Sequence, residues 1–475
     1  MFNYEEFVSN SHSLLIAPAG FGKTYTISEC LKFTRGKQLI LTHTHAGVAS
    51  IKEKIRKAGI QSLFYNVETI TSFARRYVLA FYTKDDIPDQ EDSKKYYPFI
   101  IEKAISLFGN NLIREVVTNT FNGLFVDEYQ DCSLGQHQLI LVLSDLFPTR
   151  ILGDYLQGIF GFNSGSLVDL QSSEDMGHFW SNRYVLETPW RWIIGENKTL
   201  GQDLRMIRSL LEDNKPIDLN DFNSLEVNIS NDIYKDDYNK IFKILNEEES
   251  LLILTPESSY IESRLDFIKR FKNLCFLIES IDEKDFYNLS KKFDNMDREN
   301  VFSVIREVSL KLFNNTGINN WFTESGIKKK KSESDKLLAK PIQIKLEHLR
   351  QKISYSMVSE LLRNINNLPG VKCYRKELFA SVCRVLGEAE DDAISVHEAM
   401  LNKRNMIRRV GRKIYGKCIG TTLLTKGLEF DAVLVINAHN FDCPKNLYVA
   451  LTRASRRLII FSKSKDLNLY LSKDR

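Results

Sequence analysis

The sequence lacks the cysteine spacings that build a small metal or redox site. Its 7 cysteines lie far apart and form no CxxC pair, which excludes a zinc ribbon and a thioredoxin-type site. An odd, scattered set of cysteines is typical of a reducing compartment. The sequence also has no apolar run of membrane-spanning length, and its N-terminus, MFNYEEFVSN, is acidic where a signal peptide is basic. We therefore expect a soluble, cytoplasmic protein with no membrane partner.

A strong charge imbalance is also absent. The chain has 65 lysines and arginines against 61 aspartates and glutamates, for a formal net charge of +4. This mild basic excess is compatible with a nucleic-acid partner, but most proteins of similar charge bind none. The length of 475 residues predicts roughly three domain-sized units, enough to bury a sizeable core.

Short apolar runs alternate with helical stretches in the first half of the chain. Continuous apolar runs of this length are typical of strands in a parallel sheet that is covered on both faces. Because the segments between them are long enough for crossover helices, we expect a doubly wound α/β architecture. The predicted strands are Leu14 to Ala17, Gln38 to Thr42, Gly123 to Asp127, Arg150 to Asp154 and Tyr184 to Thr188.

Two segments interrupt this alternation. Residues 81–117 begin with a polar, turn-rich stretch and continue with a helical pattern from Tyr97 to Val117, which predicts a small insertion. Residues 271–410 have helical apolar spacing throughout. Within them, the run from Lys328 to Lys336 is expected to be an exposed loop, and a solvated basic run is more common than a nucleic-acid contact.

Strands on both sides of the longer helical block predict a second α/β domain that carries it as an insertion. This second set begins near Val185. Its predicted strands are Leu251 to Thr255, Ala432 to Asn437 and Arg457 to Ser462.

The segment from Ala17 to Thr26, APAGFGKTYT, follows a predicted strand and opens a predicted helix. Glycines in this context let backbone N–H groups surround phosphates, and the helix N-terminus adds partial positive charge. Lys23 is expected to reach the β- and γ-phosphates, and the Thr24 hydroxyl is expected to bind Mg²⁺. Ala17 replaces the usual leading glycine, but the flanking strand and helix make an ordinary tight turn an unlikely alternative.

Two carboxylates end the next apolar strand, in GLFVDEYQD. Asp127 is expected to hold Mg²⁺ and Glu128 to polarise the attacking water. Two solvated acids at an ordinary strand end would be the alternative if this motif stood alone. Together with the phosphate loop, it predicts hydrolysis of a nucleoside triphosphate.

Further charged and aromatic residues follow other strands. Gln157, after the strand that ends at Asp154, is placed to sense the γ-phosphate. Phe160 and Phe162 are spaced to stack on unpaired bases, although aromatics at this spacing are more often core residues. Arg191 in TPWRW and Arg453 in YVALTRASRRL could supply the positive charge that phosphoryl transfer needs, although a single arginine is more often a surface residue.

These motifs resemble those of the UvrD-like branch of superfamily 1 helicases, along most of the chain. VDEYQD, KGLEFD and VALTRA are the most specific. The segments occur in the family's order: APAGFGKT, LTHTHAGVASIKEKI, TITSFARR, VDEYQD, GDYLQGIFGF, PWRW, TTLLTKGLEFDAV and YVALTRA.

The resemblance implies two RecA-like P-loop motor domains with parallel sheets, ATP and Mg²⁺ between them, and single-stranded DNA or a tailed duplex as partner. It divides the chain into motor domain 1A (1–80 and 118–184) with a 1B-like insertion (81–117), and motor domain 2A (185–270 and 411–475) with a helical 2B-like insertion (271–410). The implied activity is that of an ATP-dependent translocase or helicase that moves 3′ to 5′.

Residue roles follow from matching positions. Catalytic roles fall on Lys23, Asp127, Glu128, Gln157, Arg191 and Arg453, and Mg²⁺ binding on Thr24 and Asp127. Nucleotide contacts fall on Ala19, Gly20, Gly22, Lys23, Thr24, Tyr25, Trp190, Gly427 and Glu429, with Trp190 against the base and Glu429 against the ribose. DNA contacts fall on His43, Thr44, Thr71, Phe73, Phe160 and Phe162.

Several departures from the family pattern keep a second hypothesis open. No glutamine precedes the phosphate loop to read adenine, His43 and Leu423 replace a phenylalanine and a histidine, and Asn163 stands where a basic residue is common. The insertions are also short, as in compact UvrD-like proteins of anti-phage systems such as the Gabija type. The chain could therefore be a nucleotide- or DNA-sensing regulatory ATPase that works beside a nuclease partner. A nuclease site in the chain itself, around Asp89 and Asp92, is less favoured because these acids lie in a polar loop and are too close together.

Overall fold

The structure is a computed structural model that describes residues 2–88, 92–159, 166–256, 260–278, 284–324, 326–410, 414 and 416–469. The chain divides into two compact units. One consists of residues 1–236, 408–413 and 425–475, and the other of residues 237–407 and 414–424. Within the described ranges, no helix combines the length and the apolar character needed to cross a membrane.

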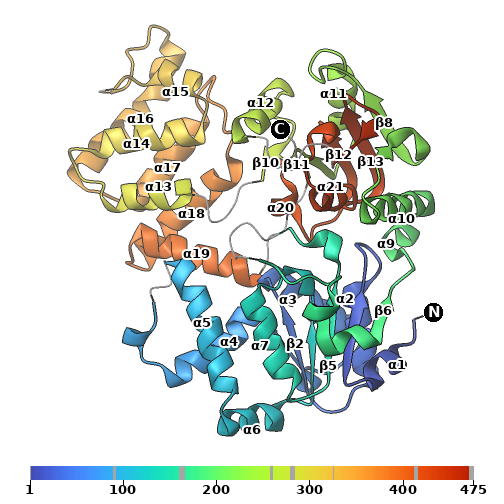
Figure 1. Cartoon of the computed structure of the whole chain (residues 1–475). Helices are drawn as coiled ribbons and strands as arrows, with labels where there is room; N and C mark the ends of the chain where they lie inside the picture. The colour runs from blue at the N-terminus through green and yellow to red at the C-terminus, as the bar shows by residue number, and fades with distance from the viewer. Residues whose placement is uncertain are drawn as a thin grey trace. The chain divides into compact units, whose positions relative to one another are not determined.

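The first sheet has six parallel strands in the order β3-β2-β4-β5-β1-β6. Figure 1 labels β2, β5 and β6 of this sheet. All neighbouring strands in this order are parallel, and β2-β4, β5-β1 and β1-β6 are not consecutive in sequence, so the chain must cross over between strands. The strands are β1 (His12–Ile16), β2 (Gln38–Thr42), β3 (Tyr65–Thr69), β4 (Gly123–Val126), β5 (Thr149–Gly153) and β6 (Arg183–Val185).

One face of this sheet carries a large apolar core. Leu39 and Leu41 of β2 and Leu124 and Val126 of β4 belong to one buried cluster with residues of α4 (Ile70–Phe81), α5 (Ser93–Phe108) and α7 (Leu134–Ser144). These three helices are labelled in Figure 1. Leucine at alternate positions on the same strand shares a face because strand side chains have a period of two residues. The α-helices up to residue 236 are α1 (Tyr4–Ser9), α2 (Lys23–Cys30), α3 (His45–Lys57), α4 (Ile70–Phe81), α5 (Ser93–Phe108), α6 (Asn111–Thr120), α7 (Leu134–Ser144), α8 (Ser173–Met176), α9 (Trp190–Ile194) and α10 (Lys198–Glu212).

A second set of six strands in the described residues has three strands in each unit. In the first unit, β8 and β12 each pair in parallel with β13, and in the second unit, β9 and β10 each pair in parallel with β11. The strands are β8 (Leu225–Ile229), β9 (Leu251–Leu254), β10 (Phe276–Leu277), β11 (Lys417–Gly420), β12 (Phe430–Ile436) and β13 (Ala454–Ser462). The first unit also contains α21 (Pro444–Leu451) and a short antiparallel pair of β7 (Ile217–Asp218) and β14 (Asp466–Leu467). The expected mixed α/β fold with two parallel sheets is thus confirmed.

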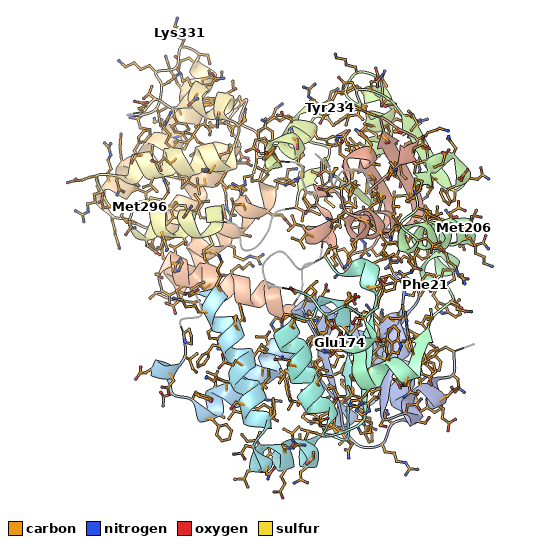
Figure 2. All side chains as sticks on the ribbon, viewed as in Figure 1. Phe21, Glu174, Met206, Tyr234, Met296 and Lys331 are labelled. Atoms are coloured by element: carbon orange, nitrogen blue, oxygen red, sulfur yellow. The ribbon has the colours of Figure 1, made fainter. Side chains whose placement is uncertain are left out.

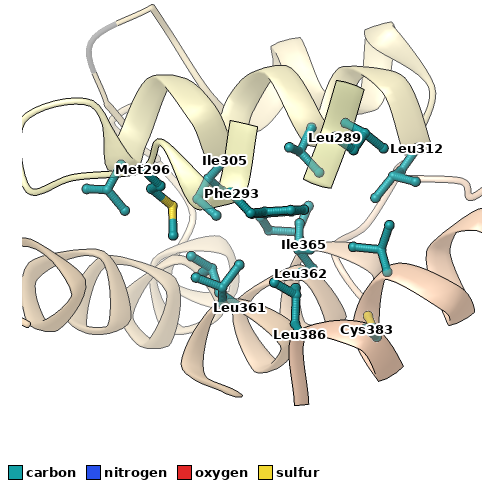
Figure 3. Packing of buried hydrophobic residues seen from close by; sticks show 14 of the residues in the cluster. Leu289, Phe293, Met296, Ile305, Leu312, Leu361, Leu362, Ile365, Cys383 and Leu386 are labelled. Carbon is teal, nitrogen blue, oxygen red and sulfur yellow. The ribbon is translucent and has the colours of Figure 1, made fainter. Parts of the chain in front are cut away.

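The second unit is mostly helical and has an apolar core of its own. Phe293 of α13 points toward Leu362 and Ile365 of α17 within this core (Figure 3). The helices are α11 (Tyr238–Glu247), α12 (Ile261–Arg270), α13 (Lys284–Asp294), α14 (Val301–Leu312), α15 (Asn315–Trp321), α16 (Glu333–Gln351), α17 (Tyr355–Asn366), α18 (Lys376–Asp391) and α19 (Val396–Val410), and α20 (Thr422–Thr425) ends at the unit boundary.

Two sequence-based helix predictions need correction. The helix expected from Tyr97 to Val117 is instead two helices, α5 and α6. Helix α5 ends at Phe108 with Gly109 as its C-cap, and the Asn110 side chain caps α6 by accepting from Leu112 N. The loop expected up to Lys336 ends earlier, because Ser332 caps α16 and the helix begins at Glu333.

The strands that were not predicted are β3, β7, β8, β10, β11 and β14, and β3 and β8 show one reason. Both lie at an edge of their sheet, and their sequences alternate polar and apolar residues, as in YNVET and LEVNI. Continuous apolar runs are typical of central strands that are covered on both faces, so they do not indicate edge strands of this kind. Strand β6 overlaps the run from Tyr184 to Thr188 that was predicted in the first half of the chain, and it pairs with β1 of the first sheet.

Candidate nucleotide-binding site

The phosphate loop lies between β1 and α2, as the sequence predicts. Ala17 N donates to Gly153 O at 2.9 Å, which fixes the start of the loop against β5. Ala19 N donates to Asp154 Oδ2 at 3.0 Å. Gly22 precedes α2 with a φ of 91°, and the helix begins at Lys23, so the backbone turns at a glycine where most residues would be strained.

The PWRW segment packs directly on this loop. Arg191 N donates to Gly20 O at 2.9 Å. A Cβ atom added to Gly20 would lie 2.9 Å from the Trp192 ring, and one added to Gly22 would lie 3.2 Å from Trp190 Cδ1. Phe21, labelled in Figure 2, is buried and lies edge-on to Trp192 with ring centroids 6.3 Å apart. The two glycines are therefore required by close contacts as well as by their positive φ angles.

Lys23 forms the centre of a charged cluster with the carboxylates that follow β4. Its Nζ atom lies 2.7 Å from Glu128 Oε1 and 3.7 Å from Asp127 Oδ1. Burial disfavours the charged ammonium, but the carboxylates of Glu128 and Asp127 outweigh it and raise the pKa of Lys23. A buried, charged lysine at the N-terminus of a helix is the arrangement that binds a polyphosphate.

The pKa values of the two carboxylates shift in opposite directions. Burial raises the pKa of Asp127, although Lys23 opposes it. Burial also acts on Glu128, but the positive charges of Lys23 and Lys426 outweigh it and lower the pKa of Glu128. Glu128 also has a left-handed backbone, with a φ of 57°, which is uncommon outside glycine and is concentrated at functional sites. Glu128 is therefore held ionised in a strained conformation next to Lys23.

Gln130 connects these carboxylates to the end of β5. Its Nε2 atom donates to Glu128 Oε2 at 2.5 Å, and its Oε1 atom accepts from Asp154 N at 2.9 Å. Asp154 Oδ2 in turn accepts from Gln157 Nε2 at 2.9 Å. The predicted sensor Gln157 thus belongs to a hydrogen-bonded chain that begins at the predicted catalytic carboxylate.

The two predicted arginines come together from distant parts of the chain. Arg191 Nε lies 2.8 Å from Glu429 Oε2, and an Nη1 atom of Arg191 donates to Thr452 O. Arg453 is buried, and its Nε donates to Val449 O at 2.9 Å. Burial, with Arg191 nearby, lowers the pKa of Arg453 to about 10. Both side chains are bound by protein groups here, so a nucleotide contact would require them to exchange partners.

The residues predicted to contact the base and the ribose have different surroundings. Trp190 and Tyr25 are 47% and 51% exposed, so both rings present a face that a base could stack on. Gly427 has a φ of 82°, and its neighbour Glu429 pairs with Arg191.

The residues predicted to contact DNA do not form one exposed surface. The Thr44 side chain caps α3 by accepting from Gly47 N at 3.0 Å, and Thr71 is half-buried in α4. Phe73 is fully buried and stacks on Phe108 at 5.7 Å. Its sequence position predicted a DNA contact, but the α4 face that carries it is turned into the core, so the side chain is not available to a base. Phe160 and Phe162 lie outside the described residues.

His43 lies beside the charged cluster. Its Nε2 atom is 3.5 Å from Cys132 Sγ, and burial together with Lys426 lowers the pKa of His43 to about 4. The imidazole is therefore neutral at pH 7 and adds no positive charge for a nucleic-acid phosphate.

Three basic side chains without a predicted role, those of Lys54, Arg208 and Lys426, also lie near this site. Lys426 binds Asp131, and Arg208 of α10 binds Asp154. For Lys54 of α3, burial lowers the pKa while Asp127 and Glu429 oppose that change. Lys426 lies in the KGLEFD motif and Asp131 in the VDEYQD motif. The motifs therefore marked both residues, but the sequence did not show that the two side chains form an ion pair.

Mg²⁺ fits the donor set at this site. The Thr24 hydroxyl and the Asp127 carboxylate are hard oxygen ligands, and Mg²⁺ commonly takes one or two protein oxygens together with phosphate oxygens and water. No group of three or more His, Cys, Asp or Glu side chains in the described residues could hold a metal ion unaided. The site therefore suits an ion that arrives with a triphosphate.

Residues 4–163 match a family model described as an AAA domain. The matched segment contains the phosphate loop, the carboxylates after β4 and Gln157. It supports a P-loop, helicase-like family and a nucleotide-hydrolysing enzyme of ATPase or helicase type. None of the curated proteins compared with the chain matches it.

Proposed function

We propose that the chain is an ATP-dependent translocase or helicase on single-stranded DNA that moves 3′ to 5′. The observation that carries the proposal is the contact of PWRW with the phosphate loop. Arg191 N binds Gly20 O, while the Arg191 side chain binds Glu429 and Thr452. A movement of the phosphate loop on nucleotide binding would therefore displace Arg191 and, through its side chain, Glu429 before β12 and Thr452 after α21.

The chain's own residues supply most of the hydrolysis step. Lys23 neutralises the triphosphate, and Glu128, kept ionised by its neighbours, orients the attacking water and accepts its proton. Arg191 and Arg453 stabilise the charge that develops during phosphoryl transfer. Bound Mg²⁺, held by Thr24 and Asp127, would supply further charge neutralisation at the phosphates.

We further propose that residues 81–117 and 271–410 are the two insertions of the motor domains, 1–80 with 118–184 and 185–270 with 411–475. The separate helical core around Phe293 supports the longer insertion.

The test is hydrolysis of ATP with Mg²⁺, with and without single-stranded DNA, and unwinding of duplexes that carry a 3′ or a 5′ tail. We expect stimulation by DNA and unwinding of the 3′-tailed duplex. Lys23→Ala should abolish hydrolysis, whereas Lys32→Ala, in an exposed pair with Glu29 at the end of the same helical segment, should not. Full activity of Lys23→Ala would overturn the proposal.

A second candidate is a nucleotide- or DNA-sensing regulatory ATPase of a nuclease complex. The observation that favours it is the weak DNA surface, since Phe73 is buried and His43 is neutral at pH 7. This function predicts slow hydrolysis, little unwinding alone and a stable complex with a nuclease protein. Monomeric elution both alone and in the presence of the neighbouring gene product would count against it.

A further inference from the structure

Gln157 is bound at both ends by groups that belong to buried ion pairs. Its backbone carbonyl accepts from Lys426 Nζ at 2.5 Å, and its side-chain Nε2 donates to Asp154 Oδ2 at 2.9 Å. Lys426 Nζ also binds both carboxylate oxygens of Asp131, at 2.6 and 2.5 Å. The sensor residue is therefore not free to move without changing the surroundings of two carboxylates.

The second ion pair lies on the other side of Gln157. Asp154 Oδ1 binds Arg208 Nη1 at 2.7 Å, and the same Nη1 atom donates to the Tyr448 hydroxyl at 2.9 Å. Arg208 Nε also pairs with Glu212 at 2.6 Å, and its guanidinium lies 5.0 Å from the centroid of the Tyr155 ring. Arg208 is thus fixed by α10, by α21 and by the segment that contains Gln157.

Asp154 also connects this arrangement to the phosphate loop. The Oδ2 atom that accepts from Gln157 Nε2 also accepts from Ala19 N at 3.0 Å. A shift of the loop on phosphate binding would therefore act on the same oxygen that holds the Gln157 amide. Asp154 is completely buried, so bulk solvent does not reach this oxygen and the loss of a partner is costly.

Burial makes both pairs strong constraints on position. Asp131 and Asp154 are buried, as are the side chains of Lys426 and Arg208. Removing one partner of a buried ion pair leaves the other charge uncompensated, which is strongly unfavourable. Because the pairs resist separation, they hold Gln157 in a defined place relative to the phosphate loop.

We infer that Lys426 and Arg208 are positioning residues for Gln157, which they hold at its backbone carbonyl and, through Asp154, at its side-chain amide. The inference rests on the proposed function, in which Gln157 responds to the γ-phosphate. Neither cation needs to touch the nucleotide. Both residues follow the last strand of the first sheet and lie between the PWRW and VALTRA motifs. The position of Gln157 therefore depends on residues that are distant from it in the sequence.

The test measures kcat and KM for ATP in Lys426→Met and Arg208→Gln. We expect kcat to fall roughly 10-fold or more with KM within about 3-fold of wild type, since the step affected is hydrolysis and not binding. Lys463→Met and Arg205→Gln are the matched controls, because these cations are exposed and Arg205 lies on the same helix as Arg208. The controls should retain wild-type kcat.

A double-mutant cycle with Gln157→Ala separates positioning from general damage. If both cations act through Gln157, their substitution in the Gln157→Ala background should lower kcat little further. Losses that multiply fully in that background would overturn the inference. Lys426→Arg and Arg208→Lys, which keep the charge, provide the same cycle if the uncharged variants do not fold, as judged by thermal unfolding.

The inference and the proposed function fail in different ways. A wild-type chain whose hydrolysis equals that of Lys23→Ala would reject the proposed function. Normal wild-type hydrolysis with wild-type kcat in folded Lys426→Met and Arg208→Gln would reject the positioning role alone.

Discussion

Lys23 Nζ lies 2.7 Å from Glu128 Oε1, so the lysine that would bind the triphosphate is already paired with the carboxylate that would activate water. An incoming phosphate therefore competes with Glu128 for the same ammonium group. We expect this competition to free Glu128 to orient the attacking water.

The first prediction concerns Glu128. Glu128→Gln should retain nucleotide binding but lower kcat for ATP hydrolysis about 100-fold or more, because general-base catalysis typically contributes ~10²–10⁴-fold. Binding of a fluorescent ATP analogue and steady-state hydrolysis would measure the two properties. Glu115→Gln, at an exposed position of α6, is the control and should leave both unchanged. Hydrolysis by Glu128→Gln at the wild-type rate would remove Glu128 from the mechanism.

A second prediction compares two glycines with similar backbone angles. Gly20 and Gly59 have φ angles of 78° and 76°, but a Cβ at Gly20 would lie 2.9 Å from Trp192, whereas a Cβ at Gly59 would meet nothing within 4 Å. Gly59→Ala should cost only the backbone strain of about 1–2 kcal/mol. Gly20→Ala should also displace the PWRW segment and abolish hydrolysis. Thermal unfolding and ATPase assays measure both effects, and equal loss of activity in the two variants would contradict the expected role of the contact.

A third prediction separates two tryptophans of the same short helix. Trp190 is half exposed, whereas Trp192 is buried and its Nε1 donates to Ala454 O at 2.9 Å. Trp190→Ala should raise KM for ATP roughly 10-fold with little change in stability, because stacking on a base is worth ~1–3 kcal/mol. Trp192→Ala should lower the free energy of unfolding by about 3–5 kcal/mol. An unchanged KM in Trp190→Ala would show that this ring does not contact the base.

The sequence predicted local units better than distant contacts. The spacing of Gly22 and Lys23 between an apolar run and a helical segment was enough to predict the strand, loop and helix that position this lysine. Nothing in the spacing could pair Arg208 with Asp154, because that contact depends on how α10 packs against the end of β5. Phe73 shows that a motif position does not determine which way a side chain points. Its motif position suggested DNA, but the orientation of α4 is decided by the core that Phe73 shares with Phe108.

The last prediction concerns the pH dependence of stability. Burial and the nearby charge of Lys426 lower the pKa of His43 to about 4 in the folded protein, against about 6.5 in an unfolded chain. Between these values the unfolded chain binds a proton that the folded protein does not, so His43 makes the folded state less stable as the pH falls. The slope from this residue is at most about 1.4 kcal/mol per pH unit. Unfolding measured at pH 7 and pH 5 should therefore show a smaller loss of stability in His43→Gln than in the wild type. His178→Gln, at an exposed histidine, should lose as much as the wild type, and an equal loss in all three proteins would mean that His43 takes up its proton without unfolding.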